Sequence, residues 1–429
     1  MDTRHLPQGL TFHLVKMPRL PVAAVSLVLD AGEAGMPGPE AGWGLLAGTA
    51  LQGGTGQRSG DALARALEGA GSGVGVATGW DAVHLELTVL PERLPLVLPL
   101  LMEMVREPAF PQDEVKRARE RRLATIRQRA MDPGALADDW AAAEIHHSDS
   151  PYARPLGGTA ESIAKVEAAD LVGLVERRYR PMGGTLVVAG DVEGDEVLAM
   201  LEPLLRGWEG GPLSVQAPSL SLPRSREARV VLVDRPGSVQ SELRLGHVGV
   251  PRASPYHASL RVVNALLGGT FSSRLNLNLR EKNGFTYGVR SRFSFRRGAG
   301  PFWVGTAVDR EVTAAAVGEV LDEVRGLRDQ GPTELEVASS RDYLAGVFPL
   351  QLQTVEDVAG RIGSLAVHGL PPSAMVEERD AIRGVSVEAA GEAARLHLKP
   401  EEMVVVVVGD AAVVRAPLEA LGVGPVEVR

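Results

Sequence analysis

The sequence of 429 residues contains no cysteine. Disulfide bonds, zinc–thiolate sites and cysteine nucleophiles are therefore excluded, and any metal site would need histidine and carboxylate ligands. Asparagine is nearly absent too. The four are Asn264, Asn276, Asn278 and Asn283, and three of them lie between positions 276 and 283. A residue type that the rest of the chain avoids predicts a specific local role where it clusters.

The chain also lacks an excess of positive charge and a long apolar run. Its net charge is −9, which argues against a nucleic-acid-binding surface. The most apolar region, 85–106, is interrupted by charged residues, so it does not predict a membrane span. The N-terminus shows neither the apolar core nor the cleavage site of a signal peptide. We therefore expect a cytoplasmic protein.

Residues 207–227, GWEGGPLSVQAPSLSLPRSRE, are rich in glycine, proline and serine and predict a linker between domains 1–206 and 228–429. The two halves share a pattern. Segments 163–191 and 382–410 each run from a helical stretch through a proline to a β-branched run that ends in Gly-Asp, at a constant offset of 219 residues. We interpret this as an internal duplication.

Strand and helix patterns are mixed in both halves without strict alternation. This favours an α+β fold of two homologous domains, each a mixed, largely antiparallel sheet packed against helices. We expect those helices on one face of each sheet. The alternating segment 83–89 predicts a half-buried strand whose outward face exposes His84 to solvent.

Catalytic motifs are absent at first reading. No two of the nine histidines are three or four residues apart, the spacing that places two metal ligands on one helical face. The adjacent pair His146 and His147 precedes a loop and is a poor candidate for a metal site. The chain has neither a G-x-S-x-G elbow nor a G-x-x-x-x-G-K phosphate loop.

The region richest in candidates is 268–296, GGTFSSRLNLNLREKNGFTYGVRSRFSF. Arg280 ends an apolar stretch, and Tyr287 opens the next predicted strand. A guanidinium fork and a phenol could together hold a carbonyl or an oxyanion. The alternative is structural, with an arginine at a helix end and a tyrosine in a sheet. The Gly-Gly-Thr at 268–270 is likewise either a helix cap or a substrate contact.

Residues 268–289, GGTFSSRLNLNLREKNGFTYGV, resemble the C-terminal signature of the pitrilysin or insulinase family of zinc peptidases. YARPLGGT at 152–159, RRYRPMGGTLVVAGDV at 177–192 and the duplicated halves also fit. The resemblance implies an N-terminal domain built around an inverted zinc motif, H-x-x-E-H, with a distant glutamate as third ligand.

The zinc motif itself is missing. Aligned on AGWGLLAGTALQGGT at 41–55, the two ligand histidines fall on Leu45 and Thr49, and the catalytic glutamate falls on Gly48. The third ligand falls near Ile126. All four positions are degenerate, so the resemblance implies an inverzincin-like helix that packs without holding a metal. We expect no cofactor in this chain and zinc in a presumed partner.

A second functional pair of the family is retained. The family places an arginine and, seven residues later, a tyrosine beside the scissile bond, which corresponds to Arg280 and Tyr287 here. The resemblance implies a non-catalytic subunit, as in the mitochondrial processing peptidase. Arg280 and Tyr287 would act in trans on a peptide, with Asn276, Asn283 and Phe285 in substrate binding.

The expected partner is a zinc-bearing homologous subunit in a heterodimer, and duplicated halves also allow a homodimer of the isolated chain. The Gly-rich segment 69–80 would pair poorly with a peptide, because glycine weakens strands. The alternative function is a structural or peptide-binding subunit with no part in hydrolysis. A third, an independent peptidase, predicts one bound zinc per chain.

Overall fold

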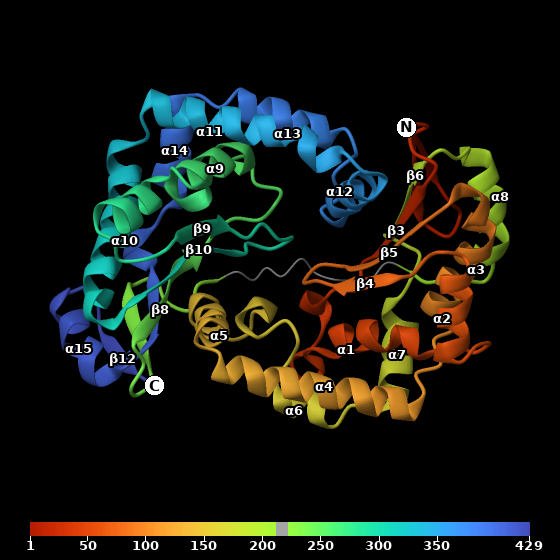
Figure 1. The fold of residues 1–429 in the computed structure, drawn as a ribbon, viewed down its shortest axis with the longest axis horizontal. Coiled ribbons are helices and arrows are strands. Elements are labelled where there is room, and N and C mark those ends of the chain that lie inside the picture. The colour runs from red at the N-terminus through yellow and green to blue at the C-terminus, as the bar shows by residue number, and fades with distance from the viewer. Residues whose placement is uncertain (212–221) are drawn as a thin grey trace. The chain divides into compact units, whose positions relative to one another are not determined.

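The computed structural model describes residues 1–211 and 222–429, so positions 212–221 of the expected linker lie outside the described residues (Figure 1). The described chain forms two compact units. The first contains residues 1–126, 156–211 and 349–375, and the second contains residues 127–155, 222–348 and 376–429. Each half of the sequence therefore contributes one segment to the unit that is formed mainly by the other half.

The first unit is built on a six-stranded sheet with the order β1-β2-β6-β3-β5-β4. Its strands are β1 (Asp2–His5), β2 (Thr11–Lys16), β3 (Ala23–Leu29), β4 (Gly75–Thr78), β5 (Val83–Val89) and β6 (Thr185–Gly190). Only the β2–β6 pair is parallel among these described strands. The short strand β4 lies at one edge.

The second unit has a sheet of the same size with the order β12-β7-β11-β8-β10-β9. Its strands are β7 (Arg229–Asp234), β8 (Gln240–Val248), β9 (Val289–Phe293), β10 (Pro301–Asp309), β11 (Val404–Gly409) and β12 (Val426–Val428). Pairs β7–β11 and β7–β12 are parallel, and the others are antiparallel. The mixed, largely antiparallel sheets confirm the expected α+β class.

The two sheets repeat one topology. Strands β2, β6, β3, β5 and β4 occupy the same places and directions as β7, β11, β8, β10 and β9. The matching strands β6 and β11 end at Gly190 and Gly409, which are 409 − 190 = 219 residues apart. The sequence offset and the strand order therefore describe the same duplication.

Helices cover one face of each sheet and complete its main core. In the first unit these are α1 (Trp43–Ala50), α2 (Gly60–Gly69), α3 (Leu94–Arg106), α6 (Ala160–Ala164), α7 (Ala168–Arg178) and α8 (Gly194–Leu205). In the second they are α9 (His257–Asn264), α10 (Thr313–Gln330), α11 (Glu334–Val347), α13 (Ala374–Arg383), α14 (Val387–His397) and α15 (Ala411–Ala420). The long helix α4 (Gln112–Met131) runs across the boundary between the units. No helix in the described ranges has the length and apolar character needed to cross a membrane.

The expectation that helices lie on one face only is wrong. The other face of the first sheet is covered by α12 (Val355–Val367), whose Val355, Val358 and Ile362 pack on β3 and β6. The corresponding face of the second sheet is covered by α5 (Pro133–Ile145), which packs on β8 and β11. Figure 1 shows α12 in blue beside β3, and α5 in orange beside β8.

The covering helices also correct the prediction for His84. It lies on the face of β5 that we expected to be exposed, but it is half-buried beneath α12, where its ring faces Gly363. Burial lowers the pKa of His84 below its usual value, despite the opposing charge of Glu86. Strands β3 and β11 are buried along their whole length, as expected of strands covered on both faces.

Candidate functional site

The helix in the position of the zinc motif, α1, is a well-packed element. The buried carboxylate of Glu33 accepts hydrogen bonds from the backbone N–H groups of Gly42 (2.9 Å) and Leu45 (2.8 Å). It thus satisfies donors at the positive end of the helix. The Trp43 indole donates to the carbonyl of Ser162 at 2.9 Å, and Leu46 lies in the core. Capping and packing therefore hold this helix in place.

The space that the motif side chains would need is filled. A Cβ atom added at Gly48 would lie 2.6 Å from Oγ1 of Thr78 and 3.3 Å from Cγ1 of Val76, both on β4. The Thr78 hydroxyl in turn donates to the carbonyl of Gly44 at 3.2 Å, which ties the strand to the helix. The Thr49 hydroxyl donates back to the carbonyl of Leu45 at 2.9 Å. Strand β4 thus packs directly where a glutamate would stand.

These residues do not fit a zinc ion. Leu45 and Gly48 offer no donor atom, and Ile126 on α4 packs against the apolar core of the first unit. Among residues 1–211 and 222–429, no cluster of three His, Cys, Asp or Glu side chains could hold a metal.

His146 is a buried residue on which both ring nitrogens lack a hydrogen-bond partner among the described atoms. Burial, helped by the charge of Arg296, lowers the pKa of His146 to about 3, so the ring is neutral. It packs edge-on against Tyr152 with ring centres 5.8 Å apart. This histidine is part of the packing of the second unit.

Arg280 and Tyr287 lie on the surface of the second unit. Arg280 is in the last turn of a π-type helical segment, Asn276–Lys282, with its side chain about one third exposed. Its guanidinium carbon lies 4.1 Å from the centre of the Phe271 ring, in cation–π geometry. Its Nε is 3.5 Å from a carboxylate oxygen of Glu281, a weak surface contact. The guanidinium is oriented by Phe271, and its donors remain accessible.

Tyr287 is 96% exposed and lies two residues before β9. No hydrogen bond joins its hydroxyl to another described residue. A tyrosine this exposed gains little from packing, so its phenol is available to a ligand. The neighbouring residue Thr286 fixes the backbone of this segment, because its hydroxyl accepts a hydrogen bond from the Thr306 hydroxyl at 2.8 Å.

The clustered asparagines connect this segment to its surroundings. The buried amide of Asn276 donates to the Val289 carbonyl (2.9 Å) and accepts from the Val289 N–H (3.2 Å). This amide therefore joins the helix that carries Arg280 to the strand that follows Tyr287. Asn283 donates to the side-chain oxygen of Asn278 at 2.6 Å. Phe285 packs, half-buried, against the core of the unit.

The peptide-binding roles expected for Asn276, Asn283 and Phe285 stay predictions. What the sequence did not indicate is that Asn276 holds two backbone segments together, and that Asn278 bonds Glu319 (2.8 Å) and Glu323 (2.7 Å) of α10. The rarity of asparagine in this chain was the only signal for this network.

Two models of one family match the chain. "Insulinase (Peptidase family M16)" matches residues 12–151, and "Peptidase M16 inactive domain" matches residues 165–344. A crystal structure of a "peptidase M16 inactive domain from Pseudomonas fluorescens" superimposes with a TM-score of 0.89 at 26% identity, covering 95% of this chain and 97% of that one. The chain belongs to peptidase family M16.

Relatives within the family have differing names. "Uncharacterized zinc protease Rv2782c" of Mycobacterium tuberculosis is 28% identical over 83% of this chain and 82% of its own length. "Non-peptidase homolog YmxG" of Helicobacter pylori is 22% identical over 91% of this chain and 90% of its own. Similarity to inactive-domain proteins, together with the four degenerate positions, is consistent with a non-catalytic member of the family.

Proposed function

We propose that this chain is the non-catalytic, substrate-binding subunit of a heterodimeric zinc metallopeptidase that acts on peptides. The observation that carries the proposal is the contrast within one chain. The zinc-motif position at Gly48 is closed by β4, whereas Arg280 is partly exposed, Tyr287 is exposed, and their segments are joined by Asn276. The metal would then come from a homologous partner.

The chemistry assigned to this chain is hydrogen bonding. The guanidinium of Arg280 and the phenol of Tyr287 both donate, so together they bind the carbonyl oxygen of a peptide and stabilise the negative charge that forms on it during attack. Phe271 beneath the guanidinium restricts its rotamers, so less entropy is lost on binding.

The test is peptide cleavage by the purified chain mixed with a zinc-bearing M16 chain from the same organism. Removing one donor of this kind costs roughly 10²-fold in kcat, so we expect losses of that order for Arg280→Ala and for Tyr287→Phe. Arg325→Ala, on the exposed face of α10, is the control and leaves the rate unchanged. If both test variants cleave at the wild-type rate, the proposed role in hydrolysis is wrong.

The alternative function, a structural or peptide-binding subunit with no part in hydrolysis, has one observation in its favour. The Helicobacter pylori relative, similar along most of both chains, is named a non-peptidase homologue. This alternative predicts that Arg280→Ala weakens peptide binding while cleavage by any partner stays unchanged. Native mass measurement of the pair and of the chain alone distinguishes heterodimer from homodimer.

A further inference from the structure

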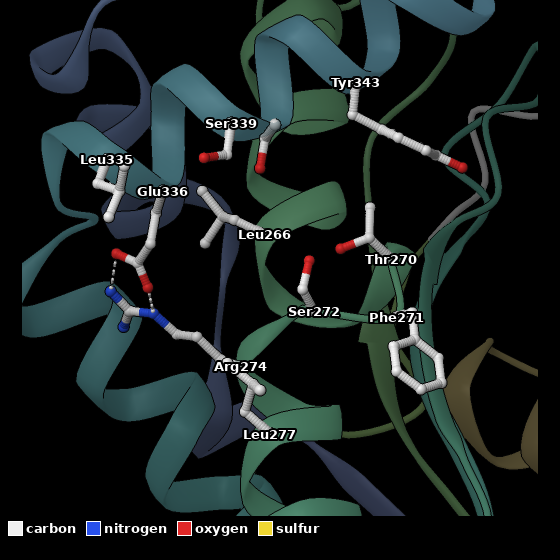
Figure 2. A pocket seen from close by; sticks show the side chains of 11 residues that line it. Leu266, Thr270, Phe271, Ser272, Arg274, Leu277, Leu335, Glu336, Ser339 and Tyr343 are labelled. Carbon is white, nitrogen blue, oxygen red and sulfur yellow. Dashed lines mark hydrogen bonds and ion pairs between the residues drawn. The ribbon is translucent and has the colours of Figure 1, made fainter.

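A pocket of about 410 Å³ opens on the surface of the second unit beside Phe271 (Figure 2). One wall is the turn that follows α9 and the start of the next helix, and the opposite wall is the exposed side of α11. Its lining residues are Leu266, Thr270, Phe271, Ser272, Arg274, Leu277, Leu335, Glu336, Ser339, Ser340 and Tyr343. The volume is within the range of pockets that bind small ligands or single side chains.

The charged residues of the pocket neutralise each other. Arg274 donates to both carboxylate oxygens of Glu336, at 2.5 and 2.7 Å, and also to the carbonyl of Gly331. Burial opposes ionisation of Glu336, but hydrogen bonds from Arg274 and Thr333 lower its pKa to about 2. Figure 2 shows this pair at one end of the pocket. A charged ligand group would find no free counter-charge there.

The rest of the lining consists of apolar and aromatic side chains together with serine and threonine residues, and several of its large side chains are exposed. Phe271 is 69% exposed and Tyr343 is 51% exposed, and both lie at the other end of the pocket in Figure 2. Leu277 and Leu335 are also exposed. Large apolar side chains that gather around one hollow mark a binding site. The aromatic side chains of Phe271 and Tyr343 in the lining favour an aromatic occupant over an aliphatic one.

Phe271 also connects the pocket with the donor pair, which is Arg280 and Tyr287. Its ring lines the pocket and carries the Arg280 guanidinium 4.1 Å from its centre. A peptide whose carbonyl is bound by Arg280 therefore brings a neighbouring side chain to the pocket. In an extended peptide, alternate side chains point to the same side, so one residue near that carbonyl is selected.

We propose that this pocket binds a large apolar side chain, preferably aromatic, of the peptide whose backbone is held by Arg280. The inference rests on the proposed peptide-binding function and adds a preference to it: a peptide with an uncharged aromatic residue beside the bound carbonyl. Arg280 and Tyr287 bind the peptide backbone whatever the peptide sequence, and the pocket selects for an aromatic side chain.

The experiment measures binding of three fluorescein-labelled octapeptides to the full chain by anisotropy. The peptides consist of threonine and alanine and differ at one central position, which is phenylalanine, alanine or glutamate. Burying a phenylalanine ring predicts a Kd roughly tenfold lower, or more, for the phenylalanine peptide than for the alanine peptide. The glutamate peptide should bind no better than the alanine peptide.

Two variants test the pocket without touching Arg280. Ser339→Trp, at an exposed position of α11, fills the pocket and should remove the preference for phenylalanine while leaving the alanine peptide unchanged. Leu335→Gln removes one apolar wall and should reduce the same preference. Asp342→Trp, exposed on the same helix and outside the lining, is the control and should retain it. Circular dichroism melts establish that each variant is folded.

Arg280→Ala separates this inference from the proposed function. We expect it to weaken the phenylalanine and alanine peptides by the same factor. If it does so while wild-type protein binds both peptides equally, the pocket inference fails and the proposed function stands. If Ser339→Trp removes the preference for phenylalanine but Arg280→Ala weakens binding of neither peptide, the pocket inference stands and the role of Arg280 fails. Absence of binding by the phenylalanine peptide at about 1 mM overturns the pocket inference.

Discussion

At the scale of single residues, the loss of the zinc site is a matter of space as well as ligands. Thr78 is bonded to the carbonyl of Gly44 and occupies the volume next to Gly48. Substituting histidines and glutamate into α1 would therefore not by itself rebuild a site. The helix has become part of the packing against β4, and its capping by Glu33 holds it there.

Gly48→Ala tests this packing. The added methyl meets Thr78 and Val76 and should lower the free energy of unfolding by roughly 1–3 kcal/mol, the usual cost of overpacking. Gly326→Ala is the matched control, because no described atom beyond the adjacent turns of its own helix lies within 4 Å of a Cβ at that position. It should be neutral or stabilise the protein. Urea unfolding of both variants gives the comparison, and equal effects would contradict the closed-site account.

His146 predicts a pH dependence of stability. Its pKa is about 3 in the folded protein, mainly because of burial and secondarily because of Arg296, whereas an unfolded histidine titrates near 6.5. Below about pH 6.5 the unfolded chain therefore binds more protons, so stability is complete above that pH and falls as the pH drops toward 3.

His146→Phe removes this proton linkage. Between pH 7 and pH 5 we expect the variant to lose less unfolding free energy than the wild type, by on the order of 1–2 kcal/mol. His147→Gln, at the exposed neighbouring position, should lose as much as the wild type. Urea titrations at the two pH values provide the measurement. Identical pH profiles for His146→Phe and wild type would contradict the assignment.

At the scale of elements, the relative position of Arg280 and Tyr287 depends on the contact between the helix that carries Arg280 and the strand that follows Tyr287. The side-chain amide of Asn276 forms hydrogen bonds with both the N–H and the carbonyl of Val289. It thereby fixes the end of the Tyr287 segment against the helix that carries Arg280. This contact explains why an asparagine stands there in a chain that otherwise avoids the residue.

Asn276→Ala should leave buried backbone groups of Val289 unpaired and cost roughly 1–3 kcal/mol of unfolding free energy. Hydrogen exchange of the Val289 amide should accelerate more than exchange elsewhere in β9. Asn283→Ala is the control and should cost less, because among the described residues the Asn283 side chain bonds only to Asn278. If Val289 exchange is unchanged in Asn276→Ala, the contact does not hold the two segments.

The sequence predicted some elements at their observed bounds and missed others for physical reasons. Strand 83–89 was expected and is found at those bounds, because its alternating pattern is strong. Helices α5 and α12 were not expected, since the sheets that they cover come from the other half of the sequence. The fully apolar run of β11 was the available signal for a sheet buried on both faces.

The candidate site likewise contains residues that the sequence could predict and features that only the fold reveals. Arg280 and Tyr287 could be selected from local sequence, because they lie seven positions apart in a segment that resembles the family signature. The pocket beside Phe271 could not, because its other wall begins at Leu335, more than sixty positions later, and only the fold brings the walls together. The closure of the zinc-motif position by Thr78 depends on packing and is likewise invisible in sequence.

At the scale of the whole molecule, the exchanged helices make each half of the sequence dependent on the other. Without α12, the apolar residues Ala24, Val187 and Ala189 of the first sheet lose their cover. Without α5, residues Val231, Val404 and Val406 of the second sheet lose theirs. The compact units therefore require both halves of the chain.

Expressing residues 1–206 and 228–429 as separate chains tests this dependence. Each alone should be unfolded or aggregated, because it exposes one face of its sheet and carries an unpaired apolar helix. Co-expression should yield a soluble 1:1 complex, detected by size-exclusion chromatography and circular dichroism. Two halves that fold independently, with cooperative melts, would contradict the exchange.

The central claim is that the metal of the proposed peptidase lies outside this chain. Metal analysis combined with native mass measurement tests it most directly, on the purified chain and on the chain co-expressed with a zinc-bearing M16 partner. The account predicts no stoichiometric zinc in the chain alone and one zinc in each 1:1 pair. One zinc per chain in the purified protein without its partner would contradict it.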